Sequence, residues 1–195
     1  MSEARDRWLD EGVRVLADEG FNGIRIDRLA ARLGLSKGSF HHHFQGADDF
    51  KRELLSRVER LSVDALEQAI SNAPASGNAR DILGHLTDAV GAPAVGLYRP
   101  ELDVAVRAWA LSDADARATL ARIDEARLSA LEAVWRPLVG TDAEARTAAL
   151  VPYLLAVGAA VTSPPVSGAQ LKAVFDMILP LVPEATPEQD VAPAP

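Results

Sequence analysis

Apolar residues recur three or four positions apart along nearly the whole chain, and no segment alternates apolar and polar residues as a strand does. This periodicity predicts an all-α protein. Gly and Pro residues bound the periodic segments and set their expected ends. The expected helices are Ala4 to Glu19, Ile26 to Leu33, Lys37 to Phe44, Gly46 to Asn72, Ala79 to Val90, Leu102 to Leu111, Asp113 to Val139, Asp142 to Thr162 and Gly168 to Leu181.

A very short gap separates the second and third of these helices. Gly34 is the expected stop signal after Leu33, and two residues later Ser36 offers an N-cap hydroxyl to the next helix. Two short amphipathic helices joined through such a turn are typical of a helix-turn-helix, in which Leu35 fills the corner. A generic helical hairpin has the same spacing, so the outward face of the second helix distinguishes the two.

That outward face is polar and carries no acidic residue. At 100° per residue, Phe40 and Phe44 point inward and His42 points outward. The other residues of this face are Lys37, Gly38, Ser39, His41 and His43. Lys37 lies in the first turn, where a recognition helix meets base edges, and Gly38 leaves room for DNA to approach. The alternatives are a solvated polar face or a metal site, but consecutive histidines on a helix diverge by 100° and cannot converge on one ion.

The charge distribution separates this region from the rest of the chain. The net charge is -8, yet residues 1–60 hold eleven basic and eleven acidic side chains, so the excess lies in residues 61–195. Residues 25–45 carry four basic side chains against the single Asp27, namely Arg25, Arg28, Arg32 and Lys37. A local basic patch within an acidic protein indicates a DNA-binding surface.

Residues Trp8 to about Leu55 closely resemble the N-terminal DNA-binding domain of the tetracycline-repressor (TetR) family. The segment LGLSKGSFHHHF, Leu33 to Phe44, matches the turn and recognition helix of the family nearly position by position. The resemblance implies that Lys37, Gly38, His41 and His42 reach bases, and that Arg25, Ser39, His43 and Gln45 contact phosphates, with Ser36 as the cap. Arg25 stands where the family usually has a hydroxyl, which removes a helix cap.

The resemblance also implies the organisation of the chain. We expect a helix-turn-helix domain over residues 1–46, a helical ligand-binding and dimerisation domain over 47–182, and a disordered Pro-rich tail over 183–195. The N-terminal residues show no signal-peptide pattern, and no apolar run reaches about 18 residues. A cytoplasmic protein that does not contact the membrane is therefore expected, and the absence of Cys suits this compartment.

The last two expected helices are apolar on several sides, so more than one neighbour must cover them. As in the family, they are expected to pair with a second copy in a four-helix interface. The alternative is that they fill the core of one protomer. The candidate interface residues are Leu150, Leu154, Gly158, Val161, Leu171, Phe175 and Ile178.

A site for a small, mainly apolar effector is expected among the polar-tipped side chains of an otherwise aliphatic region. The candidates are His85, Tyr98, Trp109, Trp135 and Tyr153, with Trp109 the first choice, although each also suits an ordinary core position. Asp81, His85 and Asp88 share one helix face, but a second cluster of ligands is missing from the sequence, so neither a metal nor another cofactor is expected.

The sequence contains no phosphate-binding glycine loop, nucleophile elbow or metalloprotease motif, so we expect a regulator rather than an enzyme. The predicted function is a homodimeric transcriptional repressor, released by its effector from a palindromic operator in double-stranded DNA. The alternative is a helical protein-interaction module, which would show no salt-sensitive DNA binding. Because His41 and His42 face the DNA, affinity is expected to rise as the pH falls from about 8 to 6.

Overall fold

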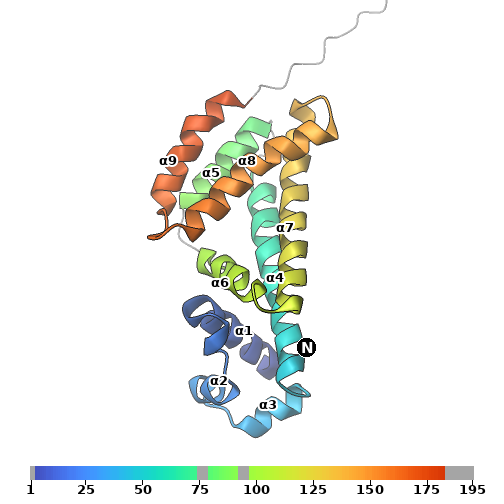
Figure 1. Cartoon of the computed structure of the whole chain (residues 1–195), viewed down its shortest axis with the longest axis vertical. Helices are drawn as coiled ribbons and strands as arrows, with labels where there is room; N and C mark the ends of the chain where they lie inside the picture. Colours follow the sequence, from blue (N-terminus) through green and yellow to red (C-terminus); the bar gives the residue numbers. More distant parts are fainter. Residues whose placement is uncertain (1–2, 74–78, 92–96, 183–195) are drawn as a thin grey trace, which may run out of the picture. The chain divides into compact units, whose positions relative to one another are not determined.

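The computed structural model describes residues 3–73, 79–91 and 97–182, and all regular structure in this part of the chain is helical, as predicted (Figure 1). The predicted break at residues 74–78 and the predicted tail lie outside the described residues. The α-helices are α1 (Glu3–Glu19), α2 (Ile26–Leu33), α3 (Lys37–His43), α4 (Ala47–Ser71), α5 (Ala79–Gly91), α6 (Pro100–Ala110), α7 (Ala114–Trp135), α8 (Asp142–Val161) and α9 (Gly168–Ile178).

Two helices end three or four residues earlier than predicted. α7 ends at Trp135 and continues as the 3₁₀ helix η2 (Arg136–Leu138), and α9 ends at Ile178 before η3 (Leu179–Leu181). Each short 3₁₀ segment contains a proline, Pro137 or Pro180. Proline lacks the N–H that an α-helix needs and disfavours helical geometry in the residue before it.

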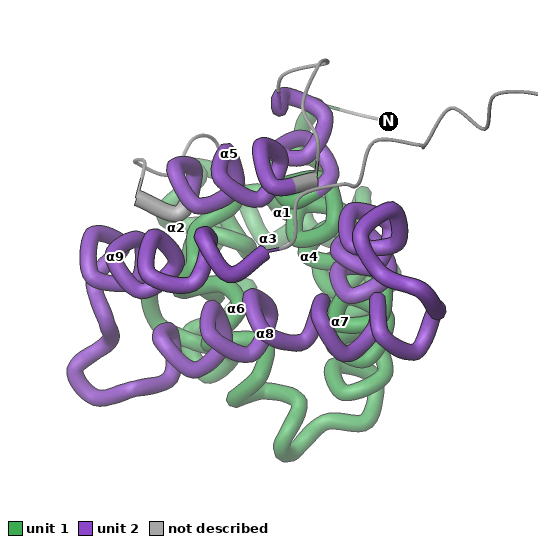
Figure 2. Tube along the Cα trace, turned by 90° about the horizontal axis from the view of Figure 1, so that it is seen from above, with its two compact units in different colours: residues 1–66, 93–126 green, residues 67–92, 127–195 purple. Residues whose placement is uncertain are grey.

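The chain divides into two compact units, coloured separately in Figure 2. Unit 1 comprises residues 1–66 and 93–126, and unit 2 comprises residues 67–92 and 127–195. Unit 1 therefore contains α1, α2, α3 and α6 together with the first parts of α4 and α7. This division by packing differs from the expected domains 1–46 and 47–182, which stay a prediction about function.

Unit 1 is built around four aromatic rings. Trp8, Phe40, Phe44 and Phe50 are each at most 2% exposed, and the ring centroids of Phe40 lie 5.3 Å from Trp8 and 5.0 Å from Phe44. The pair of Phe40 and Trp8 is edge-to-face, an arrangement that adds to the free energy gained by burying the rings. The cluster fixes α3 between α1 and the start of α4.

In unit 2, α9 packs along α5 and also contacts α8 (Figure 2). Leu83, Val134 and Val182 form a small buried cluster with partly buried neighbours that include Trp135. α8 buries mainly small residues, and by length and composition it is the one described helix that is apolar enough to cross a membrane. A single helix of this kind is weak evidence for a membrane span, because surfaces that pack against a partner are also apolar.

Candidate nucleic-acid interface

The turn between α2 and α3 is held by backbone geometry that the sequence predicts. Gly34 adopts the left-handed conformation, with φ at 64°, which side chains with a Cβ rarely adopt. The N–H of Leu35 donates to the carbonyl oxygen of Ala30 at 2.9 Å, and the Leu35 side chain packs against the core of unit 1. From α1, Arg7 donates to the Leu33 carbonyl at 3.2 Å. Together these contacts fix the angle at which α3 leaves α2.

The two helix starts differ in their caps. At α3, the Ser36 hydroxyl accepts a hydrogen bond from the Ser39 N–H at 3.2 Å, which confirms the predicted N-cap. At α2, Arg25 occupies the N-cap position and its side chain makes no capping hydrogen bond. The cap is therefore absent at α2, as predicted, and the Arg25 guanidinium remains largely exposed beside Asp27, with a separation of 3.8 Å.

The outward face of α3 lies open to solvent. Lys37, Gly38, His41 and His42 are exposed, while Ser39 and His43 are half-buried. Gln45, just beyond the helix, is exposed too. The structure thus brings the predicted base-contacting side chains onto one accessible surface of a short helix whose other face packs in the aromatic core.

Gly38 has no role that internal packing explains. A Cβ at this position would meet only the Ser36 hydroxyl oxygen, at an ordinary contact distance of 3.5 Å. Glycine within a helix costs about 1 kcal/mol relative to alanine. The absence of a side chain here instead leaves space on the outer surface of α3, which suits the close approach of a ligand backbone or base.

A carboxylate fixes the link from α3 to α4. The Asp49 side chain accepts the Gln45 N–H at 3.0 Å and pairs with Arg52 at 3.0 Å. The hydrogen bond from the Gln45 backbone, followed by the interaction with Arg52, lowers the pKa of Asp49 below its ordinary value. Asp49 therefore stays ionised and holds Gln45 next to the end of α3.

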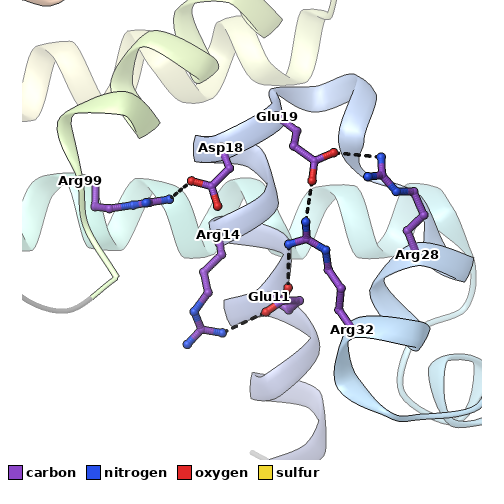
Figure 3. Close-up of polar contacts among 7 residues, drawn as sticks. All are labelled: Glu11, Arg14, Asp18, Glu19, Arg28, Arg32 and Arg99. Atoms are coloured by element: carbon purple, nitrogen blue, oxygen red, sulfur yellow. Dashed lines mark hydrogen bonds and ion pairs between the residues drawn. The ribbon is translucent and has the colours of Figure 1, made fainter.

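The predicted basic patch is smaller than its four side chains suggest (Figure 3). Arg28 lies 2.9 Å from Glu19, and Arg32 lies 2.7 Å from Glu19 and 3.2 Å from Glu11. Both acids lie on α1, so these arginines are engaged inside unit 1. The sequence analysis missed these pairs because the partners are far apart in the chain and no helix spacing rule connects them.

The expected effector residues do not gather in one unit. Trp109 is 3% exposed and stacks on Phe21 of η1 (Phe21–Gly23), with ring centroids 4.1 Å apart, so it belongs to the core of unit 1. Tyr98, also in unit 1, donates to Asp103 at 2.7 Å. The remaining candidates are half-buried in unit 2, and they are His85, Trp135 and Tyr153.

The expected interface residues divide into three groups by exposure. Leu154 and Val161 are 58% and 55% exposed, and Phe175 is buried within its own unit, which corrects its assignment to a surface. Half-buried positions make up the rest, namely Leu150, Gly158, Leu171 and Ile178. The sequence analysis missed four exposed apolar residues on or next to the same two helices, namely Val151, Val174, Met177 and Leu181. The i, i+3 spacing of Val174 and Met177 could have identified them.

Within the described ranges, no group of three or more His, Asp or Glu side chains is placed to hold a metal ion. The rings of His42 and His43 lie edge to face, with centroids 5.1 Å apart and an interplanar angle of 73°.

Comparison with known proteins places the helix-turn-helix in a family. Residues 9–58 match the model of "Bacterial regulatory proteins, tetR family". An uncharacterised HTH-type transcriptional regulator of Bacillus subtilis, YwcC, is 31% identical over 75 residues, which cover 31% of this chain and 34% of that protein. The match thus spans about a third of the curated relative.

Solved structures share the fold over most of the chain. The reduced form of Escherichia coli NemR is 20% identical and has a TM-score of 0.77, and the alignment covers 94% of this chain and all of that chain. A putative transcriptional regulator from Saccharomonospora viridis in complex with choline is 21% identical, with a TM-score of 0.70 and coverage of 92% and 97%. The α1 to α4 region, residues 9–58, thus matches the N-terminal domain of the tetR family of bacterial regulatory proteins, and the all-helical fold of most of the chain is shared with solved structures of transcriptional regulators.

Proposed function

We propose that the chain is a cytoplasmic, homodimeric repressor that places α3 in the major groove of an operator and is released by a small effector. The observation that carries this proposal is the outer face of α3. Lys37, Gly38, His41 and His42 are exposed there, without an acidic neighbour on the helix, on a base of packed aromatic rings. Such a rigid, polar and non-acidic helix face suits major-groove contacts.

Exposed apolar residues on α8 and α9 support a homodimer. On α8 the spacing of Val151, Leu154 and Val161 places these side chains along one side of the helix, and a Cβ at Gly158 would meet nothing within 4 Å. On α9, Val174 and Met177 are 38% and 77% exposed. A second copy that packs against this surface would form a four-helix interface and bury the apolar area.

A homodimer constrains the operator. Two helix-turn-helix domains related by a two-fold axis require a roughly palindromic site, with half-sites about one helical turn apart. α3 lies entirely in unit 1, together with α1 and α2, so each protomer contributes one complete recognition helix.

Unit 2 offers the first candidate for effector binding. The Trp135 ring is half-buried beside Leu83 and Val134, and its indole Nε1, like those of Trp8 and Trp109 in unit 1, is buried without a hydrogen-bond partner among the described residues. A buried donor without a partner is costly, and an acceptor on a bound molecule would relieve that cost. One structural neighbour holds choline, so this fold accommodates a small organic molecule in at least one protein.

Contacts of α6 with α1 and η1 would allow a movement of α6 to reach the helix-turn-helix domain. Arg99, which precedes α6, pairs with Asp18 of α1 at 2.7 Å, and Trp109 near the other end of α6 stacks on Phe21. A displacement of α6 would therefore move the end of α1. An effector that binds the displaced state more tightly would favour a conformation in which the two helix-turn-helix domains no longer match the half-site spacing. The coupling free energy between effector binding and DNA binding would be about 1 to 3 kcal/mol.

The test is DNase footprinting on the DNA that flanks the chain's own gene, followed by affinity measurements on the protected site. The double substitution Lys37→Ala and His42→Ala is expected to abolish the preference for the operator over random duplex, since each base contact contributes about 1 to 3 kcal/mol of discrimination. Sedimentation should show that the variant remains a dimer.

Arg60→Ala is the matched control, because it removes one exposed positive charge from α4 rather than from α3. It should preserve the ratio of operator to random affinity. Unchanged specificity in the Lys37 and His42 double variant would refute the proposal. A wild-type protein without salt-sensitive DNA binding would favour a protein-interaction module instead.

A further inference from the structure

The inference concerns the ion pairs between α1 and α2, and it rests on the proposed function. Arg28 and Arg32 lie four residues apart on one side of α2, and the Glu19 carboxylate bridges them at 2.9 and 2.7 Å (Figure 3). Glu11 supplies a second contact to Arg32 at 3.2 Å and also pairs with Arg14. The two carboxylates thus face every guanidinium that α2 presents to α1.

The acids are enclosed more tightly than the arginines. The side chains of Glu11 and Glu19 are 14% and 27% exposed, whereas those of Arg32 and Arg28 are 40% and 50% exposed. The carboxylates are therefore fixed parts of the α1 surface, while the guanidiniums keep access to solvent and could turn to another anion. Phosphate is the anion that a helix-turn-helix brings near, because its first helix crosses the DNA backbone.

Arg25 differs from these two arginines although it lies next to the same helix. Its side chain is 66% exposed, and its acidic neighbour Asp27 is itself 52% exposed, at a longer distance of 3.8 Å. Arg25 can therefore exchange a hydrated neighbour for phosphate, whereas Arg28 and Arg32 must first leave a shared and partly enclosed carboxylate. The helix-turn-helix domain consequently presents fewer unpaired positive side chains to DNA than the number of its arginines suggests.

We propose that Glu19, assisted by Glu11, is a specificity-determining residue that holds Arg28 and Arg32 away from DNA phosphates. Phosphate contacts strengthen binding to every sequence equally, whereas base contacts distinguish the operator. By limiting the phosphate contacts, Glu19 makes the operator preference depend on α3. Removal of the carboxylate should therefore raise affinity for all DNA and lower the ratio between operator and random sequence.

The experiment compares Glu19→Gln with wild type by titrating operator and random duplexes between 50 and 200 mM salt. Each arginine that gains a phosphate should steepen the dependence of log affinity on log salt by about 0.9, which is about 3.5-fold over this range. The variant should thus bind random duplex more tightly at low salt. Adding Arg28→Gln to Glu19→Gln should return the slope toward the wild-type value.

Glu101→Gln is the matched control, since it removes one exposed carboxylate from α6 in the same unit. A slope change as large in this control would overturn the proposal, because general charge would then explain the effect. A wild-type protein that binds DNA, together with a Glu19→Gln variant of unchanged slope, would overturn this inference alone. A wild-type protein that binds no duplex would overturn the proposed function as well.

Circular dichroism would establish that Glu19→Gln is folded. If it is not, single substitutions of two arginines replace it as the test. Arg25→Gln should reduce the wild-type salt slope by about 0.9, and Arg28→Gln should reduce it by much less. Equal reductions would overturn the proposal, because they would show that Arg28 already contacts phosphate.

Discussion

The two compact units bury their apolar residues in different ways. In unit 1 the large side chains lie inside the chain itself, and Trp8, Phe40 and Leu54 are all fully buried. In unit 2, α8 buries only alanines, while Leu154 and Met177 are more than half exposed. The unit that carries the proposed recognition helix is thus complete in one protomer, and the other unit leaves apolar surface that a second copy would cover in the proposed dimer.

The prediction with the largest expected effect tests whether a second copy covers the exposed apolar residues of unit 2. Leu154→Glu with Met177→Glu alters four side chains in a symmetric dimer, and each buried apolar side chain of this size contributes about 1.5 to 3 kcal/mol. The unpaired carboxylates add a desolvation cost. We expect the dimer dissociation constant to rise by about 10⁴-fold or more, measured by analytical ultracentrifugation.

Leu111→Glu is the control for this experiment. Leu111 is 83% exposed but lies after α6 in unit 1, away from α8 and α9 in the chain. This variant should sediment as wild type does. A Leu154 and Met177 double variant that remains dimeric at micromolar concentration would show that the interface lies elsewhere.

The second prediction tests the aromatic core of unit 1. Phe40→Ala removes a ring that contacts Trp8, Phe44 and Phe50, and a substitution of this kind costs about 3 to 5 kcal/mol of unfolding free energy. Phe21→Ala removes a ring that is 38% exposed and should cost less. Urea denaturation followed by circular dichroism would measure both. Similar losses for the two variants would contradict the assignment of Phe40 to the central cluster.

The contrast also explains what the sequence could predict. Local signals fixed the helix-turn-helix: Gly34 and Ser36 set the ends of α2 and α3 nearly where the structure has them. Helical periodicity likewise placed Phe40 and Phe44 in the core. These features depend on neighbouring residues along one helix, so the chain order alone contains them.

The sequence could not show which neighbour packs against an apolar or charged face of a helix. Periodicity showed that α9 is apolar on several sides, but it could not show that Phe175 turns into its own unit while Met177 turns out. It also could not pair Arg32 with Glu19, thirteen positions away, because that contact depends on how α1 and α2 cross. The stacking of Trp109 on Phe21 could not be predicted for the same reason, since the two residues are distant in sequence.

A third prediction concerns the exposed histidines of unit 1. Histidine is the residue type whose ordinary charge change falls near neutral pH, and His41 and His42 are both exposed on α3. Operator affinity should rise as the pH falls, by at most about tenfold per pH unit for each proton taken up. Fluorescence anisotropy at fixed ionic strength would measure the rise.

The control for the histidines is the double substitution His41→Gln and His42→Gln. This variant lacks both imidazole rings, so its affinity should depend much less on pH. A wild-type dissociation constant that is constant from pH 8 to 6 would contradict protonation at the DNA surface, even if α3 does contact bases.

The prediction with the smallest expected effect concerns Asp113 at the start of α7 in unit 1. Asp113 accepts the N–H groups of Asp115 and Ala116, each at 3.0 Å, and pairs with Lys51 of α4 at 2.9 Å. The hydrogen bond from Ala116, followed by that from Lys51, lowers the pKa of Asp113. Because the folded state depresses this pKa, the stabilisation is present above the ordinary carboxyl pKa near 4 and is lost as the pH falls through the folded value.

Asp113→Asn keeps an oxygen for the cap but removes the charge, so it should lower the unfolding free energy at pH 7 by about 0.5 to 1 kcal/mol. The difference from wild type should shrink as the pH falls below 4, because the wild-type carboxyl then becomes neutral too. Asp64→Asn on the exposed side of α4 should show no such difference. A destabilisation by Asp113→Asn that is as large at low pH as at pH 7 would show that the side chain acts through its shape rather than its charge.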